Sequence, residues 1–467
     1  MSRTTEHARP GMGGFLVAVA ATFVMVLVLN IATSQDRSHD AADDVSPAGL
    51  AHRPPLEAPP VPTVAAAPDG RELFLREWMA GDPRSHGGDG LGPVFNETSC
   101  VGCHNLGGAG GAGPSAKNVQ LVALVRLTSE ANGFHSRREA VTIVLHRHST
   151  EADYARRWRN VFGSVPGPAR ERNTPALFGA GLIDAIDEAV IEEAATKRFE
   201  KFPDVSGRVA RGHDGRLGRF GWKADTATLK DFVLQACAVE LGLDVPGHPQ
   251  PPLPYLTEKK SPGLDMTTAQ CDALIEYVRA IPAPSYQEPT HTKHAEAVRD
   301  GREAFTTVGC ATCHTPDLGE VEGLYSDLLL HDVGLRLADG GSAYGGKAKP
   351  DSPSDKSIPK PPDPKKKGNN KGSVVTPARP KPPVVAAAAE WRTPPLWGVR
   401  DSTPYLHDGR ATTLEMAILM HAGEAADSAA AYQRLTPRQK RNLVAFLKSL
   451  VAPDVSPPAR LAALPDK

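Results

Sequence analysis

The first thing this chain of 467 residues lacks is a net charge, since 53 lysines and arginines stand against 54 aspartates and glutamates. Nucleic-acid binding depends on a basic excess, so we expect no nucleic-acid partner. Cysteine is also scarce, with six residues in the whole chain. The length alone suggests two or three domains.

Four of the six cysteines fall in one pattern that occurs twice. C-x-x-C-H occupies residues 100–104 and again residues 310–314. Random order at this composition would give roughly 0.003 such patterns per chain. A thioredoxin-like site or half of a zinc site would need no histidine after the second cysteine. The pattern is that of a c-type haem, bound by two thioethers and one axial histidine. It predicts two covalent haems, held by Cys100, Cys103, His104, Cys310, Cys313 and His314.

Such haems are attached outside the bacterial cytoplasm, where disulfides also persist. The two cysteines outside the motifs, Cys237 and Cys271, could therefore form a disulfide or remain two buried thiols.

The N-terminus agrees with export. Residues 13–33 are mostly apolar and follow Arg3 and Arg9, and about 20 apolar residues are enough to cross a bilayer. We predict a membrane anchor or a signal peptide over residues 1–34, then a linker rich in alanine and proline over 35–67. The expected location is the periplasmic side of the bacterial inner membrane, with the membrane as a partner, or the periplasm itself.

More than the haem motif is repeated. D-G-R-E at residues 69–72 recurs at 300–303, and each copy predicts a capping box that begins a helix. A phenylalanine lies five residues before the first cysteine of each motif, at Phe95 and Phe305. A third landmark, T-P-x-L-x-G, follows each haem motif. Its two copies lie at residues 174–179 and 393–398.

Each half also closes with a helix. Thr267 and Thr436 both precede a glutamine by three residues and then apolar residues at helical spacing. The common order of these landmarks predicts a mainly α fold with little sheet. It contains two tandem cytochrome c-like domains, each with helices around one covalent haem c. They span residues 68–285 and 286–455, followed by a tail at 456–467.

Residues 346–389 interrupt the second domain. They contain proline, lysine, glycine and alanine with almost no large apolar residues, and cannot bury enough surface to fold. We predict a disordered insertion, whose basic character would suit an acidic redox partner. A solvated loop is the alternative.

Five stretches of sequence carry a resemblance to a known family. They lie at residues 90–105, 325–332, 392–398, 406–410 and 421–425. At these stretches the chain resembles bacterial di-haem oxidoreductases, which are also called peroxidases or thiol oxidoreductases. That group is similar to di-haem cytochrome c peroxidases and to the methylamine-utilisation di-haem enzyme. The kinship implies that the first haem is the peroxide site. It implies that the second haem takes electrons from a small redox donor protein or cytochrome.

For the second haem, the resemblance places the sixth ligand on a helix that begins near Leu414. The position that is methionine in the peroxidases is His421 here, which would give a bis-histidine iron of lower potential. Met420, His407 and His331 are the alternatives.

For the first haem, the repeat aligns Ala236 with His421, and alanine cannot bind iron. The peroxidases have a displaceable histidine shortly after the first motif, whereas the next histidine in this chain is His135. The simplest interpretation is an open or water-filled sixth position. His135, His146 and His148 are the alternatives.

The resemblance also implies roles for single residues. Residues 218–224 are similar to the peroxidase stretch that carries a tryptophan relay between the haems, which makes Trp222 the candidate, although the acidic-glycine-arginine run that usually follows is missing. Glu240 is the candidate distal base, which moves a proton between the two peroxide oxygens. The alternative for Trp222 is an aromatic residue packed in the core. The alternative for Glu240 is an exposed glutamate on a helix. Residues 402–404 partly match a loop that binds calcium.

The sequence thus favours a di-haem oxidoreductase of peroxidase type. Its N-terminal haem would be reactive and its C-terminal haem would transfer electrons. A non-catalytic, membrane-tethered electron carrier is one alternative, and an oxidase or oxygenase acting on an organic or thiol substrate is another.

Overall fold

The computed structural model describes residues 67–129, 136–162, 170–212, 214–253, 260–284, 291–339 and 386–455. The predicted anchor or signal peptide, nearly all of the linker, the tail and most of the insertion lie outside these residues. Among the helices that are described, none is long and apolar enough to cross a membrane. The chain divides into two units, Met1–Ala65 and Ala66–Lys467, and every described residue belongs to the second.

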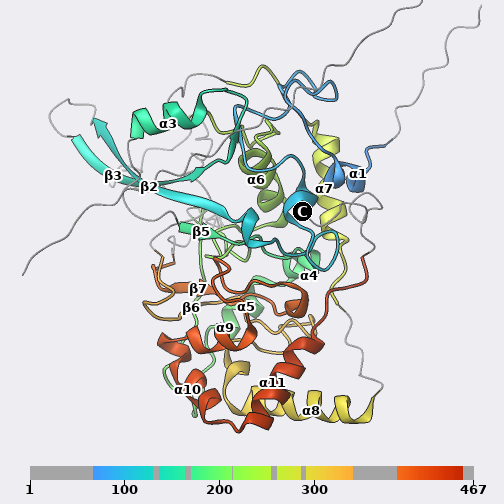
Figure 1. Ribbon diagram of the computed structural model, residues 1–467, viewed down its shortest axis with the longest axis vertical. Helices are drawn as coiled ribbons and strands as arrows, with labels where there is room; N and C mark the ends of the chain where they lie inside the picture. The colour runs from blue at the N-terminus through green and yellow to red at the C-terminus, as the bar shows by residue number, and fades with distance from the viewer. Residues whose placement is uncertain are drawn as a thin grey trace, which may run out of the picture. The chain divides into compact units, whose positions relative to one another are not determined.

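Helices make up most of the regular structure, as predicted for a mainly α fold (Figure 1). The α-helices are α1 (Gly70–Leu75), α2 (Cys100–Cys103), α3 (Tyr154–Phe162), α4 (Ala180–Ala185), α5 (Glu188–Ala194), α6 (Leu229–Leu241), α7 (Thr268–Arg279), α8 (Thr292–Thr307), α9 (Leu414–Met420), α10 (Ala426–Arg434) and α11 (Pro437–Ser449). Short 3-10 helices are η1 (Ser115–Lys117), η2 (Cys310–Thr312), η3 (Val399–Asp401) and η4 (Gly423–Ala425). The strands are β1 (Val94–Phe95), β2 (Val119–Ser129), β3 (Ser136–Leu145), β4 (His148–Ser149), β5 (Arg170–Arg172), β6 (Leu330–Asp332) and β7 (Glu390–Arg392).

One long β-hairpin accounts for most of the little sheet in the described residues. β2 pairs antiparallel with β3 from Gln120 opposite Leu145 to Ser129 opposite Ser136, and β5 pairs with the other edge of β2. Figure 1 shows the hairpin extending away from α6 and α7. Residues 119–125 read V-Q-L-V-A-L-V. Such a run, rich in β-branched residues, is typical of a strand.

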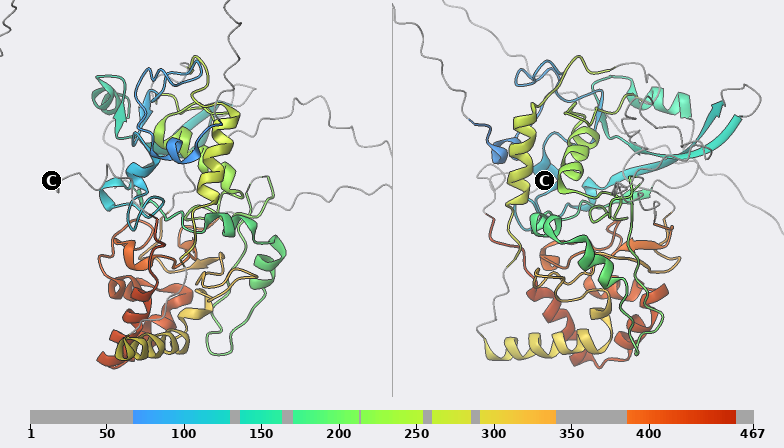
Figure 2. Two further views of the ribbon diagram at one scale, coloured as in Figure 1. Left: turned by 90° about the vertical axis from the view of Figure 1, so that its right-hand side faces the viewer. Right: turned by 180° about the vertical axis from the view of Figure 1, so that it is seen from behind.

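The helices predicted to close each half are α7 and α11, and each packs mainly on one other helix. α1 packs on α7, and α8 packs on α11, as Figure 2 shows from two further sides. Both predicted helix starts are confirmed, and each is a capping box: the side chains of Thr267 and Thr436 each accept a hydrogen bond from the backbone of the glutamine three residues on, and that glutamine's side chain accepts one from the backbone of the threonine. Both helices therefore begin at the residues that the sequence pattern predicts.

Contrary to the prediction, the two D-G-R-E copies do not both begin a helix. Asp69 does cap α1, but α8 already begins at Thr292, so the predicted helix start at residue 300 is wrong. Strong helix formers upstream of that residue extend the helix. What the two copies share is the glycine. A Cβ on Gly70 or on Gly301 would lie 2.0 Å from a backbone oxygen of the partner helix, so only glycine permits these two helix crossings.

The phenylalanine landmark also needs correction. Phe74 of α1 and Phe305 of α8 are the matching pair, because each ring centroid lies 6.4 Å from that of the histidine in its haem motif. Phe95 lies instead in β1, which pairs with β4. Its spacing from Cys100 is a coincidence of loop length.

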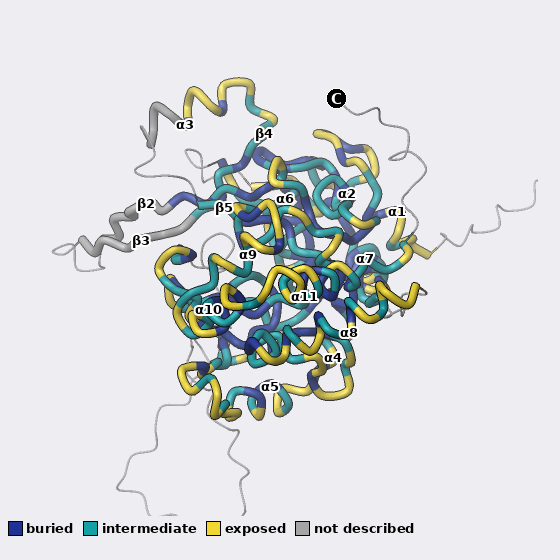
Figure 3. The backbone as a smooth tube through the Cα atoms, turned by 60° about the horizontal axis from the view of Figure 1, so that its bottom comes forward, coloured by how far each residue is buried: buried dark blue, intermediate teal, exposed yellow. Residues whose placement is uncertain are grey.

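The core is continuous between the two predicted domains. The largest cluster of buried apolar side chains joins most of the first half to Leu318, Leu324, Leu328, Leu329 and Trp397 of the second. Figure 3 shows buried segments in the interior and exposed stretches on α5 and α10. The division into two cytochrome domains at residue 285 therefore stays a prediction.

Residues 386–389 belong to the fold, although the predicted insertion included them. The ammonium group of Lys223 donates to the backbone oxygens of Ala387, Ala388 and Glu390 at 3.1, 3.0 and 2.6 Å. A buried lysine must satisfy its three donors, and here the chain leading into β7 satisfies them. Burial, the largest cause, lowers the pKa of Lys223 to about 7.

Candidate functional site

The second C-x-x-C-H motif lies in the wall of a cavity of about 300 Å³, which we call the C-terminal cavity. Cys310 and its neighbours form η2, and Cys313 and His314 follow directly. The rest of the wall is mostly apolar. It includes Phe305, Leu396, Leu414, Ile418, Leu443 and Leu447.

His421 lies in the same wall as His314. The Nδ1 atom of His314 is 2.9 Å from the oxygen of Tyr325, and the Nδ1 atom of His421 is 2.7 Å from the oxygen of Ala417. A carbonyl oxygen only accepts, so each Nδ1 carries the proton and each Nε2 keeps the lone pair that a metal requires. Burial lowers the pKa of both rings, that of His314 to about 4. Both histidines are thus in the neutral, metal-binding form.

The alternative ligands for this cavity are less suited. Both ring nitrogens of His331 already lie within 3 Å of carboxylate oxygens, those of Asp327 and Glu424 at 2.9 and 2.7 Å. Met420 is not part of the cavity wall, whereas His407 is. His407 stacks flat on Trp391, with ring centroids 3.7 Å apart and an interplanar angle of 14°.

The first C-x-x-C-H motif lines a smaller cavity of about 100 Å³, the N-terminal cavity. Cys100 begins α2, whose N-terminus is capped by the hydroxyl of Ser99. The Nδ1 atom of His104 lies 3.2 Å from the oxygen of Gly111, so its Nε2 also keeps the lone pair. Burial lowers the pKa of His104 to about 4.

The donor sets of both cavities fit a c-type haem: two cysteines on one helical turn, followed by a half-buried neutral histidine. The volume of the C-terminal cavity reaches the roughly 300–1,000 Å³ of typical cofactor pockets. The N-terminal cavity is smaller, at about 100 Å³.

The two cavities differ at the repeat position that the sequence aligned, which is Ala236 in one and His421 in the other. Thr228 caps α6 and Thr413 caps α9 in the same manner, each accepting from the backbone nitrogen three residues on. Counted from these caps, Ala236 and His421 occupy the same position, and each lines its own cavity. α6 then runs on to Leu241, whereas α9 ends at Met420. The N-terminal cavity thus receives a methyl group where the C-terminal cavity receives an imidazole.

Of the other histidines considered for the first haem, the two that the structure describes do not reach its cavity. The Nε2 atom of His146 lies 2.9 Å from the oxygen of Val239, behind α6. His148 is exposed in β4, and neither residue is in the cavity wall. His135 lies outside the described residues.

Glu240 lines the N-terminal cavity near the end of α6, so it is not the exposed helix glutamate of the alternative interpretation. Its Oε2 atom accepts a hydrogen bond of 2.7 Å from the amide of Asn96. The oxygen of the same amide accepts from the backbone of Arg147 at 3.0 Å. Asn96 therefore fixes the carboxylate in place, a role that sequence reasoning missed.

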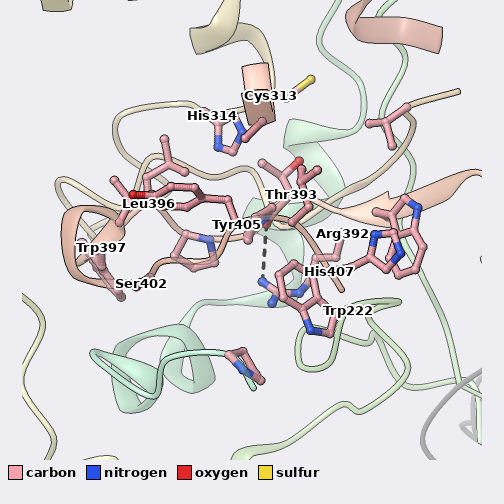
Figure 4. Close-up of a pocket in the computed structure, with 18 of the residues that line it drawn as sticks. Trp222, Cys313, His314, Arg392, Thr393, Leu396, Trp397, Ser402, Tyr405 and His407 are labelled. Atoms are coloured by element: carbon pink, nitrogen blue, oxygen red, sulfur yellow. Dashed lines mark hydrogen bonds between the residues drawn. The ribbon is translucent and has the colours of Figure 1, made fainter. Parts of the chain in front are cut away.

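Trp222 lies in the walls of both cavities. Its indole nitrogen donates to the oxygen of Asn173 at 2.8 Å, and its own carbonyl oxygen accepts from the backbone of Arg392 at 3.0 Å. Figure 4 shows Trp222 beside Arg392, across the C-terminal cavity from Cys313 and His314. The ring is thus a packed aromatic, as one interpretation held, and it also lies between the two candidate haem sites.

The T-P-x-L-x-G repeats pack against each other between the cavities. Gly179 and Gly398 both have φ of 65°, which favours glycine. A Cβ on Gly179 would lie 2.3 Å from the ring of Trp397, and one on Gly398 would lie 3.2 Å from the ring of Phe178. Each copy places its aromatic ring over the glycine of the other.

Two smaller predictions end as follows. Cys237 and Cys271 are buried free thiols, the alternative to a disulfide. In the calcium-like stretch, the hydroxyl of Ser402 donates to the oxygen of Gly398, and that of Thr403 donates to Tyr405. Calcium binding there stays a prediction.

Comparison with known proteins agrees with the class of site. Residues 373–450 match the family model described as "Di-haem oxidoreductase, putative peroxidase". The resemblance predicted from the sequence is therefore confirmed over that segment, which supports haem as the cofactor. No curated protein matches the chain.

Two solved structures are similar at a low level. Hydrazine synthase of Kuenenia stuttgartiensis is 20% identical with a TM-score of 0.32, over 61% of this chain and 74% of that one. A MauG-like protein associated with microbial copper homeostasis is 18% identical with a TM-score of 0.27, over 58% of this chain and 90% of that one. At these TM-scores the likenesses support no conclusion about function.

Proposed function

We propose that the chain is a di-haem c-type oxidoreductase of peroxidase type. One haem would be bound covalently to Cys100 and Cys103, the other to Cys310 and Cys313. The observation that supports this most is the unequal pair at one repeat position: Ala236 in the N-terminal cavity and His421 in the C-terminal cavity. The first site is left open to a small oxidant, and the second is closed by two histidines.

When bound, the haem iron would supply the redox centre at which peroxide is reduced, with two electrons and two protons consumed for each oxygen–oxygen bond. Glu240 would take a proton from one peroxide oxygen and return it to the other. The amide of Asn96 holds the carboxylate of Glu240 at the cavity wall. The electrons would come from a small redox protein or cytochrome on the periplasmic side of the membrane, as the N-terminal sequence predicts.

An electron paramagnetic resonance spectrum of the ferric holoprotein tests this proposal. We expect one low-spin signal, from the bis-histidine iron, and one high-spin signal that cyanide converts to low spin. Two low-spin signals that do not respond to cyanide would instead indicate an electron carrier with both irons closed. Peroxide turnover with a small electron donor would then separate a peroxidase from an oxidase or oxygenase that uses the same scaffold.

Trp222 is proposed as the electron relay between the two sites. Trp222→Phe keeps a ring of similar shape but one that is far harder to oxidise. We expect electron transfer from the reduced second haem to the oxidised first haem to slow at least about tenfold, equivalent to roughly 1.4 kcal/mol in the barrier. Stopped-flow absorbance after mixing with peroxide measures this rate.

Trp391→Phe is the matched control. Trp391 is another tryptophan in the cavity wall, itself buried, but it lines only the C-terminal cavity. The ammonium of Lys223 lies 3.5 Å and the guanidinium of Arg172 lies 4.9 Å from its ring centroid. Two cations so close oppose a positive charge on the ring. The control should leave the rate unchanged. Equal rates in both variants would rule out Trp222 as the relay.

A further inference from the structure

A buried group of charges lies beside the second haem motif and has no part in the proposed reaction. His331 of β6 lies between Asp327, whose carboxylate is 2.9 Å from its Nε2, and Glu424, whose carboxylate is 2.7 Å from its Nδ1. The side chains of His331, Asp327 and Glu424 are only 5%, 5% and 15% exposed. Carboxylates accept hydrogen bonds, so both ring nitrogens must carry protons. One positive and two negative charges leave the cluster with a net charge of −1.

The pKa of His331 agrees with this charge state. Burial alone would lower that pKa, but the hydrogen bonds that His331 donates to Asp327 and Glu424 raise it well above its usual value. Burial, the largest cause, would raise the pKa of Glu424, but the hydrogen bonds from His331 and from the backbones of Ser206 and Asp332 together lower it overall.

The cluster also joins the two segments that carry the proposed axial ligands. On one side, the backbone nitrogen of Asp327 donates to the oxygen of Cys313 at 3.0 Å, and the Nδ1 atom of His331 lies 3.6 Å from the Cys313 sulfur. On the other side, Glu424 belongs to η4, three residues after His421, and accepts from the backbone of Asp332 at 3.1 Å. His331 therefore connects the wall that holds His314 to the wall that holds His421.

A metal site is the competing interpretation of these side chains. Ligand atoms of Cys313, Asp327 and His331 lie within 4.8 Å of one another. Both nitrogens of His331 are however occupied by carboxylates, and the sulfur of Cys313 is the expected thioether of the haem. A charge cluster accounts for all of these contacts without an ion.

We propose that His331, Asp327 and Glu424 are positioning residues for the second haem: they hold His421 opposite His314, and their net negative charge lowers the reduction potential of that haem. The inference rests on the proposed role of His421. A negative charge buried near the iron stabilises the ferric over the ferrous state, because Coulomb interactions are strong where water is excluded. A lower potential makes the second haem a better electron source for the first.

Glu424→Gln in the holoprotein tests the charge. Glutamine retains an oxygen that accepts hydrogen bonds but carries no charge. We expect the ratio of ferrous to ferric second haem at fixed potential to rise about tenfold, which is an upward shift of about 59 mV for one electron. Spectroelectrochemical titration of the low-spin haem measures it. Asp327→Asn should shift the potential in the same direction, and serves if the first variant does not mature.

Asp427→Asn is the matched control. This carboxylate lies three residues beyond Glu424 but is exposed, so water screens it and the potential should not move. If the Glu424 and Asp327 variants titrate like this control, the charge role is overturned.

His331→Ala tests the positioning. We expect a large part of the low-spin signal of the second haem to become high spin, because the link from Asp327 through His331 to Glu424 is broken and the segment that carries His421 is held less firmly. A fully low-spin spectrum would overturn the positioning role. The proposed function fails separately: if His421→Ala leaves the low-spin signal intact, the ligand assignment itself is wrong, whatever the Glu424 variant does.

Discussion

His421→Ala should convert one of the two haem irons from low spin to high spin and leave the other unchanged. The reason is geometric. His421 lies in the wall of the C-terminal cavity, and its Nδ1 donates to the oxygen of Ala417 at 2.7 Å, which leaves Nε2 for the metal. An alanine side chain offers no donor, so the iron bound to His314 would lose its sixth ligand. Electron paramagnetic resonance of the ferric protein measures the change.

The same variant should regain its low-spin signal when imidazole is added, because the vacated space has the shape of that ring. Its reduction potential should also change, since the axial ligands are the main determinant of haem potential. His407→Ala is the control: it removes another histidine of the same wall, and the spectrum should stay as in the wild type. If only the His407 variant shows a high-spin signal, His407 and not His421 is the sixth ligand.

The residues of the candidate site that the sequence predicted are those tied to a local pattern. Each C-x-x-C-H motif fixes the spacing of two thioether cysteines and one iron ligand within five residues. The threonine caps of α6 and α9 set a common origin, and counting seven residues from Leu229 or Leu414 leads to Ala236 or His421. Capping and helical spacing act over a few residues, so one sequence reveals them. The contrast between the two cavities was predictable for this reason.

The supporting contacts were not predictable, because they join distant parts of the chain. Asn96 and Glu240 are 144 residues apart, and the cluster of His331 with Glu424 spans 93 residues. Nothing local in the sequence says that Asn96 will hold that carboxylate. A signal did exist for Glu424: it lies within the H-A-G-E-A stretch that carried the family resemblance, three residues after His421. A charged residue so close in sequence to a proposed ligand indicates a role in positioning that ligand.

The failures of the repeat argument have a common physical cause. The D-G-R-E pattern was interpreted as two helix starts, whereas Gly70 and Gly301 are kept small by close helix crossings. Phe95 was matched by its distance from a cysteine, whereas Phe74 holds the position beside the motif histidine. In both cases the shared feature is a tertiary contact, and the local pattern is a by-product of it. The hairpin β2–β3 lies outside the repeated landmarks, so the repeat pattern does not predict it.

Glu240→Gln should lower peroxide turnover by roughly 10² to 10⁴-fold, the usual contribution of a positioned acid–base group. Glutamine has nearly the same shape, and its carbonyl oxygen can accept the hydrogen bond of 2.7 Å that Asn96 now gives to Glu240. The side chain should therefore stay in place, but an amide cannot take up and return a proton. Steady-state turnover with peroxide and a small electron donor measures the loss.

Two further measurements separate this proton role from a structural one. The spin states and reduction potentials of both haems should be those of the wild type, because Glu240 binds neither iron in the proposal. Glu415→Gln, in the first turn of α9, removes an exposed carboxylate from the corresponding helix and should leave turnover unchanged. If Glu240→Gln turns over peroxide as fast as this control, the proton must reach the N-terminal cavity by another route. The unequal pair of Ala236 and His421 would then explain only why the site is open, and not how peroxide is cleaved there.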